Sequence, residues 1–329
     1  MPTNLPPEYF AVDKRYRAAT TIEEKIETLE ELLGTIPKHK GTDHLRADLR
    51  RKLSKFKDSM QKGKAGSRQV SAFSIKTEGA GQAAVVGPAN TGKSSLVAAL
   101  TNAQPEVAEY PFSTWNPTPG MMMIENVQVQ LIDTPPLNRD FVEPDLVDMI
   151  RRADLVLLTI DIQASPFDQL EETVAFLESH RIIPLHRQDD FPQDLRHTFL
   201  PFLILVNKVD DEDLDEDYKV FTELLDAAWH TVPISATTGH NVEQFKWAVF
   251  DLLEIIRVYS QAPGKEPDLN SPFVMRRGGT IEEFAAQVHQ EIASDLKTSR
   301  VWGSADFDGQ MVGRDYVLHD GDVVELRAK

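Results

Sequence analysis

The sequence predicts an α/β protein with a mostly parallel sheet covered by helices on both faces. A helical hairpin is expected before this sheet and a small α+β module after it. Apolar segments alternate with segments of helical periodicity from about residue 82 to residue 259, which is typical of parallel strands joined by helices. A glycine-rich loop, residues 87–94, follows the first apolar segment. A stretch rich in Pro and Gly, residues 260–272, then ends the alternation.

The first 66 residues are expected to form the helical hairpin. Residues 21–33 begin with a capping-box pattern and carry apolar residues at helical spacing. Residues 42–61 repeat that spacing, and the breaker-rich residues 34–41 lie between the two segments. Residues 63–68, "GKAGSR", indicate a flexible hinge to the next part of the chain.

The remaining elements follow from the same patterns. The expected strands of the sheet are 82–87, 127–133, 154–161, 201–207 and 231–235, and the expected helices are 93–101, 144–153, 168–180, 220–228 and 241–259. The C-terminal module is expected to contain strands near 273–278, 299–303 and 316–326 and a helix over 280–292, which a second capping box begins. The predicted domains are residues 1–66, 67–262 and 263–329.

Composition limits the function classes. The chain is 41% hydrophobic and 26% charged, as a globular protein is, and no apolar run approaches the ~20 residues of a membrane span. The absence of cysteine excludes disulfides, thiolate zinc sites and cysteine nucleophiles. A signal-peptide core is also lacking, so a cytoplasmic location without a membrane partner is expected.

Charge is distributed unevenly along the chain. The net charge of −17 argues against general nucleic-acid binding and specific DNA recognition. Residues 38–68, however, contain eleven Lys or Arg and three Asp, so this segment carries +8 and the rest of the chain −25. Such asymmetry is typical of an interaction arm.

The loop at residues 87–94 reads "GPANTGKS" and satisfies the phosphate-loop pattern G-x-x-x-x-G-K-[ST] between a strand and a helix. Its glycines allow a tight wrap that turns backbone N–H groups toward a phosphate. Lys93 is expected to reach the β- and γ-phosphates and Ser94 to bind Mg²⁺. The alternative is a chance glycine turn before a helix. The expected nucleotide contacts here are Gly87, Pro88, Ala89, Asn90, Thr91, Gly92, Lys93, Ser94 and Ser95.

Two polar segments that follow later strands indicate recognition of guanine. In "NKVD", residues 207–210, the Asp210 carboxylate can accept from two adjacent donors on the guanine edge, which adenine does not offer. Asn207 is expected to contact the base and support the phosphate loop, and Lys208 to lie against the ring face. The expected contacts from the second segment, "SAT", are Ser235, Ala236 and Thr237, with the Ala236 amide donating to the base. Strands that merely end in polar turns are the alternative.

A third strand, 127–133, ends in Asp133 and is followed by two prolines. The order of phosphate loop, strand-end aspartate, "NKVD" and "SA" resembles the P-loop GTPase superfamily. The segment "YPFSTWNPTPG", residues 110–120, resembles the switch region of the Obg family. Residues 264–326 closely resemble the TGS domain of the developmentally regulated GTP-binding (DRG) branch of that family. With the basic hairpin, the resemblance covers nearly the whole chain.

The resemblance implies roles for particular residues. Thr114 takes the place of the metal-sensing threonine, and Asp133 is expected to hold Mg²⁺ through a water. The family pattern after the strand is D-x-P-G, so Pro135 is expected but Pro136 stands where glycine should offer an N–H to the γ-phosphate. Leu137 occupies a position at which other GTPases carry a water-orienting Gln, and the Obg family is also apolar there.

Asn90 bears on catalysis. Asn at this place in the loop is found in GTPases that bind K⁺ beside the β- and γ-phosphates, and such an ion could replace an arginine finger. The alternative is that Asn90 only tolerates the turn geometry. The predicted catalytic set is Lys93, Thr114, Asp133 and Asn90, and the predicted metal ligands are Ser94, Thr114 and Asp133.

Together these signals predict a Ras-like GTPase domain followed by a TGS domain of β-grasp, ubiquitin-like fold. The expected activity is slow, Mg²⁺-dependent GTP hydrolysis by a guanine-nucleotide switch. Ribosome or rRNA contact is implied through residues 38–68 and the TGS domain, with a protein partner left open. Two alternatives stay open: a nucleotide-binding adaptor with negligible hydrolysis, and an RNA-binding regulator. The family inserts a small domain after switch II, for which residues 137–152 leave too little room.

Overall fold

The structure is a computed structural model that describes residues 22–35, 73–103, 116–137, 142–192 and 196–328, together with Val12, Arg15 and Leu49. It divides into two compact units, residues 1–71 and 72–329. In the first unit, α2 (Ile22–Thr35) confirms the first helix of the expected hairpin, with Leu29 and Leu32 fully buried. The second helix of that hairpin and the basic segment 38–68 lie outside the described residues, apart from Leu49.

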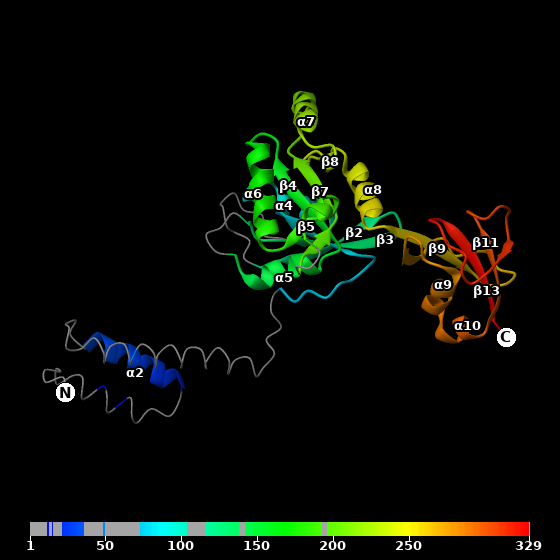
Figure 1. The fold of residues 1–329 in the computed structure, drawn as a ribbon, viewed down its shortest axis with the longest axis horizontal. Helices are drawn as coiled ribbons and strands as arrows, with labels where there is room; N and C mark the ends of the chain where they lie inside the picture. Colours follow the sequence, from blue (N-terminus) through cyan, green and yellow to red (C-terminus); the bar gives the residue numbers. More distant parts are fainter. Residues whose placement is uncertain are drawn as a thin grey trace. The chain divides into compact units, whose positions relative to one another are not determined.

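The second unit is built on a six-stranded sheet in the order β2-β3-β1-β4-β7-β8 (Figure 1). Strands β3, β1, β4, β7 and β8 are parallel, and β2 pairs with β3 as an antiparallel edge strand. Their bounds are β1 Gln82–Val86, β2 Thr118–Ile124, β3 Val127–Asp133, β4 Leu155–Asp161, β7 Phe202–Asn207 and β8 His230–Pro233. The mostly parallel sheet of the prediction is confirmed.

Helices cover both faces of this sheet, because alternate residues of the buried strands point to opposite faces. One core packs α5 (Pro144–Arg152), α6 (Pro166–Ser179) and α7 (Glu212–Leu224) against the sheet. The other core packs α4 (Lys93–Leu100) and α8 (Val242–Leu252) against the opposite face. The connection from α6 to β7 contains a small two-stranded sheet and a 3₁₀ helix. These elements are β5 (Ile182–Pro184), η1 (Leu185–Asp190) and β6 (Thr198–Leu200). Among the described residues no helix is long and apolar enough to cross a membrane.

The C-terminal module is a five-stranded sheet in the order β10-β9-β13-β11-β12, in which β9 and β13 are parallel. Phe284 and Ile281 of helix α9 are fully buried against one face of this sheet, as a β-grasp fold requires. The capping box of Thr280 and Glu283 at the start of α9 is confirmed. The bounds are β9 Ile255–Gln261, β10 Phe273–Arg276, α9 Ile281–Val288, α10 Gln290–Ser294, β11 Leu296–Trp302, β12 Gln310–Val312 and β13 Asp322–Ala328.

The predicted helix over 241–259 is wrong in its second half. Helix α8 ends at Leu252, Glu254 has a left-handed φ of 50°, and residues 255–261 form strand β9. Ile255, Ile256 and Val258 are β-branched, and their burial in a sheet outweighs helical continuation. Because β9 pairs with β10 and β13, we propose a domain boundary near residue 254 in place of the one after 262.

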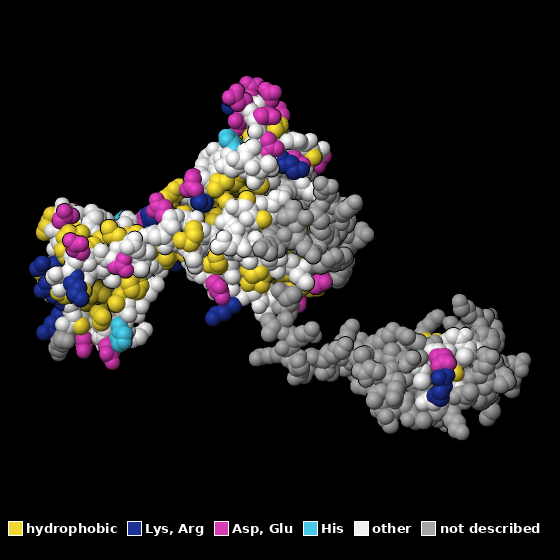
Figure 2. Space-filling view, turned by 180° about the vertical axis from the view of Figure 1, so that it is seen from behind, with side chains coloured by type: hydrophobic (Ala, Val, Ile, Leu, Met, Phe, Trp, Pro, Cys, Tyr) yellow, Lys and Arg dark blue, Asp and Glu magenta, His cyan; other side chains and the backbone are white. Residues whose placement is uncertain are grey.

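The predicted helix over 220–228 begins earlier than expected. Helix α7 starts at Glu212, where the Asp211 carboxylate accepts from the Leu214 backbone N–H as an N-cap. The acidic side chains of its first turn then lie at the positive end of the helix dipole. Figure 2 shows the acidic side chains gathered on this helix.

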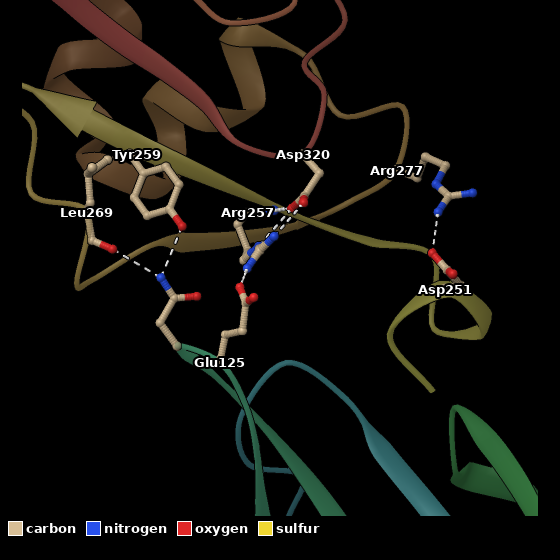
Figure 3. Close-up of polar contacts among 8 residues, drawn as sticks. Glu125, Asp251, Arg257, Tyr259, Leu269, Arg277 and Asp320 are labelled. Atoms are coloured by element: carbon tan, nitrogen blue, oxygen red, sulfur yellow. Dashed lines mark hydrogen bonds and ion pairs between the residues drawn. The ribbon is translucent and has the colours of Figure 1, made fainter. Parts of the chain in front are cut away.

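The turn between β2 and β3 contacts the C-terminal module (Figure 3). Asn126 donates from Nδ2 to the Tyr259 hydroxyl at 3.0 Å and to the Leu269 carbonyl at 3.1 Å. Glu125 pairs with Arg257, whose guanidinium also binds Asp320 through bonds of 3.0 and 2.7 Å. The β2–β3 turn and β9 are therefore joined by both ionic and neutral hydrogen bonds.

Arg257 is the centre of this contact. Its guanidinium lies 5.4 Å from the ring centroid of Trp247 and 5.3 Å from that of Phe250, both on α8. Hydrogen bonds to Asp320, and then to Glu125, raise the pKa of Arg257 although burial opposes the charge. Arg257 therefore joins the β2–β3 turn, α8 and the loop before β13.

A second contact lies at the amino ends of the parallel strands. Arg276 pairs with Asp154 at 2.6 Å and donates to the Leu253 carbonyl at 2.6 Å. The same Asp154 carboxylate accepts from the Gln82 backbone N–H at 2.9 Å. The C-terminal module therefore docks where β1 and β4 begin, at the edge of the sheet opposite to their carboxyl ends.

We expect Arg257→Leu to lower the free energy of unfolding by about 1–3 kcal/mol, because it removes hydrogen bonds to two partly exposed carboxylates. Arg277→Leu is the matched control, since the pair of Arg277 with Asp251 is 3.5 Å long and exposed on both sides. Urea unfolding followed by fluorescence and circular dichroism measures both variants. Equal midpoints for the two variants would contradict the central role of Arg257.

Candidate functional site

The predicted site residues that the structure describes come together at the carboxyl ends of the parallel strands. The phosphate loop follows β1, Asp133 ends β3, and Asn207 ends β7. The segment beginning with Ser235 follows β8. Strand ends at this edge of a parallel sheet are the usual place for a ligand.

Two glycines of the phosphate loop are required by their surroundings. Gly87 has φ 145°, and a Cβ there would lie 2.3 Å from the Thr159 carbonyl oxygen. Gly92 has φ 87°, and a Cβ there would lie 2.2 Å from Nδ2 of Asn207. Asn90 also has a positive φ, 65°, and its side chain is exposed. The backbone conformation of Asn90 is thus a turn conformation, which leaves both interpretations of this residue open.

The Lys93 amine lies inside the loop. Lys93 is 5% exposed, and its Nζ donates to the carbonyl oxygens of Gly87 at 3.1 Å and Pro88 at 2.5 Å. Helix α4 begins at this residue, so the first N–H groups of the helix face the loop. The positive charge and the helix N-terminus are both directed to the place where a phosphate would bind.

The side chains of Asp133 and Ser94 are arranged so that together they could bind a divalent metal ion. Ser94 Oγ donates to Asp133 Oδ2 at 2.6 Å, and the Asp133 carboxylate is fully buried. Its other oxygen, Oδ1, is buried without a hydrogen-bond partner. Burial raises the pKa of Asp133, and the Ser94 bond and the Lys93 charge oppose that rise less strongly. An orphaned carboxylate oxygen beside a hydroxyl suits Mg²⁺, which prefers hard oxygen ligands.

The third predicted metal residue, Thr114, lies outside the described residues, as does the rest of 104–115. Among the described residues, no group of three or more His, Cys, Asp or Glu could hold a metal. A single carboxylate with a hydroxyl agrees with a Mg²⁺ that takes its remaining ligands from phosphate and water.

Asn207 joins the phosphate loop to the segment after β8, for which the sequence predicts contact with the base. Its Nδ2 donates to the Thr91 carbonyl at 2.8 Å, and its Oδ1 accepts from the Ala236 N–H at 3.3 Å. Ser235 Oγ donates to Asp210 Oδ1 at 2.5 Å, which orients that exposed carboxylate. The support of the loop by Asn207, expected from the sequence, is present. The Ala236 N–H points to Asn207 here, so its donation to a base stays a prediction.

The turn after β8 is closed by the Ser235 hydroxyl, which accepts from the backbone N–H groups of Thr237 at 3.3 Å and Thr238 at 3.0 Å. Ser235 is fully buried. This side chain therefore holds both its own turn and the Asp210 carboxylate in place.

The segment after Asp133 is attached to the phosphate loop. Thr134 Oγ1 donates to the Val85 carbonyl at 2.7 Å, and the Leu137 N–H donates to the Gly87 carbonyl at 3.3 Å. Pro136 and Leu137 are buried, with Leu137 3% exposed. Leu137 thus offers no group to a water, as its apolar side chain predicts.

One residue of the site was missed from the sequence. Asp161, at the end of β4, pairs with Nζ of Lys208 at 2.5 Å. The available signal was the same as for Asp133: a buried apolar strand that ends in a carboxylate. No motif marks Asp161, so only the pairing of β4 with β7 brings it to the site.

These features are those of a P-loop GTPase domain: a phosphate loop with a buried lysine, a strand-end carboxylate beside the loop serine, and a segment after β8 that Asn207 joins to the loop. A sequence model described as 50S ribosome-binding GTPase matches residues 82–188, and one described as TGS domain matches residues 256–328. The chain therefore combines a GTPase domain with a TGS domain, and it is similar over most of its length to proteins named developmentally regulated GTP-binding proteins.

Relatives extend along most of the chain. An uncharacterized GTP-binding protein of Methanocaldococcus jannaschii is 28% identical over 94% of this chain and 93% of its own length. Developmentally-regulated GTP-binding protein 1 of Xenopus laevis is 24% identical over 93% of this chain and 98% of its own. In fold, the chain is similar to a GTP binding protein from Pyrococcus horikoshii, with a TM-score of 0.50 and 15% identity over 75% of this chain and 100% of that one.

The short connection after switch II agrees with the expectation of a compact chain. Strand β3 ends at Asp133 and α5 begins at Pro144, which leaves no room for an inserted domain between them. The alignment with the Methanocaldococcus protein extends over 366 residues, whereas 94% of this chain is about 309 residues. The relative therefore contains residues that have no counterpart here.

We expect Asp133→Asn to raise the melting temperature of the metal-free protein by a few degrees at pH 8. Because the pKa of Asp133 is raised in the folded state, the fold binds more protons than the unfolded chain above the ordinary value of 3.8. The contribution of the Asp133 carboxyl group to stability is therefore present at low pH and is lost as the pH rises through its pKa in the folded state. Because Asn carries no charge, the variant does not lose stability in this way when the pH rises.

The check is a melting curve in EDTA at pH 4, near the ordinary pKa value, and at pH 8, repeated with Mg²⁺ and GDP. The gain from Asn should be larger at pH 8, and added Mg²⁺ should stabilise the native sequence more than the variant. A variant that melts below the native protein in EDTA at pH 8 would contradict the assignment of Asp133 as an uncompensated buried charge.

We expect Pro136→Gly to increase GTP affinity by about ten- to a hundredfold, because a new N–H can bond the γ-phosphate. GDP lacks this phosphate, so its affinity is the internal control and should not change. Calorimetric titration with GDP and a non-hydrolysable GTP analogue measures both constants. If neither affinity nor hydrolysis changes, Pro136 is a tolerated variant without a role in nucleotide selection.

Proposed function

We propose that the protein binds GTP and GDP with Mg²⁺, hydrolyses GTP slowly and acts as a guanine-nucleotide switch that contacts the ribosome. The observation that carries the nucleotide part is the pair of bonds from Asn207 to Thr91 and Ala236. They connect the phosphate end and the base end of one site, and neither end alone would specify a guanine nucleotide.

The chemistry would be in-line attack of a water on the γ-phosphate. Lys93 and the N–H groups of the loop would stabilise the charge that develops on the phosphate oxygens. Mg²⁺, held by Ser94 and by Asp133 through a water, would neutralise charge on the β- and γ-phosphates when bound. In the described segment 134–137, the Thr134 hydroxyl donates to the Val85 carbonyl and Leu137 is buried and apolar, so we do not expect this segment to orient the water. Slow hydrolysis is expected for that reason.

K⁺ is a further proposed cofactor. Asn90 is exposed at the tip of the phosphate loop, where its side chain is available to a cation beside the phosphates. A monovalent cation there would supply part of the positive charge that an arginine finger supplies elsewhere. The comparison of K⁺ with Na⁺ belongs in the hydrolysis assay.

Ribosome contact is supported by three facts. The family model that matches residues 82–188 is described as a ribosome-binding GTPase, a TGS domain follows, and residues 38–68 carry a charge of +8. A basic segment can neutralise rRNA phosphates and release their counterions. A cytoplasmic location accords with this proposal.

The alternative is an adaptor that binds guanine nucleotide and hydrolyses it negligibly. Pro136 and the buried Leu137 favour this alternative, because the segment that would sense the γ-phosphate lacks one N–H and is bonded to the loop. Hydrolysis therefore has to be measured directly.

In a single-turnover assay with γ-labelled GTP, we expect measurable release of phosphate and a loss of about 100-fold or more in Lys93→Ala. Lys246→Ala is the matched control, because Lys246 lies on α8 and pairs with Glu243 away from the loop. The assay is run at equal ionic strength in K⁺ and Na⁺. Equal rates in the two salts would remove K⁺ from the proposal, and equal rates in the native and Lys93→Ala proteins would favour the adaptor.

We expect sedimentation with ribosomal subunits to weaken when residues 38–68 are deleted, and more strongly at low salt than at high salt. The full chain at the same salt is the reference, and retained GDP affinity shows that the GTPase domain stays folded. Binding that survives the deletion unchanged would exclude the basic segment as the contact.

A further inference from the structure

A buried acid with no assigned role lies at the edge of the nucleotide site. Asp161 is the last residue of β4 and is paired in register with Asn207, the last residue of β7. It is 8% exposed, although carboxylates are rarely buried without a partner. Its position places the carboxylate beside Lys208, the lysine of "NKVD".

The contacts of Asp161 hold Lys208 at its charged end. Asp161 Oδ2 accepts from the Lys208 ammonium at 2.5 Å, and Oδ1 accepts from the Gln163 N–H at 3.0 Å. The backbone N–H of Asp161 donates to Gln169 Oε1 at 2.9 Å, which fixes the strand end itself. The carboxylate is therefore oriented by its own neighbours before it binds the lysine.

The backbone of Lys208 is held by the same cluster. Gln163 Nε2 donates to the Lys208 carbonyl at 3.1 Å, and Lys208 has a left-handed φ of 65°. Both ends of the lysine are thus fixed, one by the last residue of β4 and the other by Gln163 just after it, and the four-carbon stem between them remains partly exposed. A stem held at both ends presents one apolar edge instead of many rotamers.

We infer that Asp161 is a positioning residue for guanine binding: it holds the Lys208 ammonium so that the lysine stem is already laid out as a platform for the base. This inference rests on the proposed guanine-nucleotide function. A lysine that is ordered beforehand loses less side-chain freedom when the base arrives, so affinity rises without a new contact to the ligand.

The inference predicts which nucleotides should lose affinity when Asp161 is replaced. Asp161 acts by holding Lys208, whose stem would contact the face of the guanine ring. Loss of Asp161 should therefore weaken the binding of GDP and of GTP by the same factor. The γ-phosphate is irrelevant to it, in contrast to Pro136. A nucleotide with hypoxanthine in place of guanine should also lose the same factor, because the face of the ring and not its edge is involved.

The test is a double-mutant cycle with Asp161→Asn and Lys208→Met, which keep side-chain size and remove the charges. We expect Asp161→Asn to raise the Kd of GDP by about two- to tenfold, the range for ordering one long side chain, mainly through faster dissociation of mant-GDP. In the Lys208→Met background the same change should have no further effect, because there is no ammonium to hold. Asp161→Glu, which keeps the charge, should bind GDP more tightly than Asp161→Asn.

Glu178→Gln is the matched control, since Glu178 pairs with Arg187 at 2.5 Å on α6 and does not contact the site. Its GDP affinity should equal that of the native protein. Equal losses from Asp161→Asn in the native and Lys208→Met backgrounds would show a structural role and overturn the inference, as would tighter binding in Asp161→Asn. Failure of the native protein to bind GDP in the same assay would instead reject the proposed function itself.

Discussion

The nucleotide site depends on one amide side chain that is bonded on both sides. Asn207 is 2% exposed, and its two bonds fix the phosphate loop at Thr91 and the base segment at Ala236. Because Nδ2 occupies the space in which a Cβ of residue 92 would lie, Gly92 and Asn207 require each other. The fold therefore sets the distance between the phosphate loop and the segment at Ala236 before any ligand binds. A ligand then loses no binding free energy to ordering these two segments.

A second constraint works against stability. Asp133 is fully buried, one of its oxygens has no partner, and its pKa is raised by burial. A protein optimised only for stability would replace such a carboxylate, since an unpaired buried charge opposes folding. The divalent cation proposed above, bound beside Asp133 and Ser94, would balance this charge. The same reasoning separates Asp133 from Asp161, which already has a cation in Lys208 and therefore needs none from solvent.

The sequence allowed the GTPase domain to be predicted because its strands are buried on both faces and read as continuous apolar runs, as in residues 155–161. The phosphate loop and "NKVD" are contiguous, so their spacing could be recognised. The end of α8 could not be found in this way, because Ile255, Ile256 and Val258 fit an apolar helix face as well as a strand, and only pairing with β13 decides. Asp161 is defined by a neighbour 47 residues away, and no local pattern contains that contact.

The described contacts of the TGS domain lie at the edge of the parallel sheet opposite to the candidate nucleotide site. These contacts, Arg257 with Glu125 and Arg276 with Asp154, lie at the amino edge of the parallel sheet, whereas the phosphate loop and Asp133 lie at the carboxyl edge. Any coupling between the TGS domain and the nucleotide site has to pass through elements that run from one edge of the sheet to the other. The β2–β3 hairpin is such an element: Thr118 pairs with Asp133 at one end, and the turn of Glu125 and Asn126 binds β9 at the other. The two strands are paired from Thr118 and Asp133 to Ile124 and Val127, so the hairpin connects the end that carries Asp133 with the turn that contacts the TGS domain.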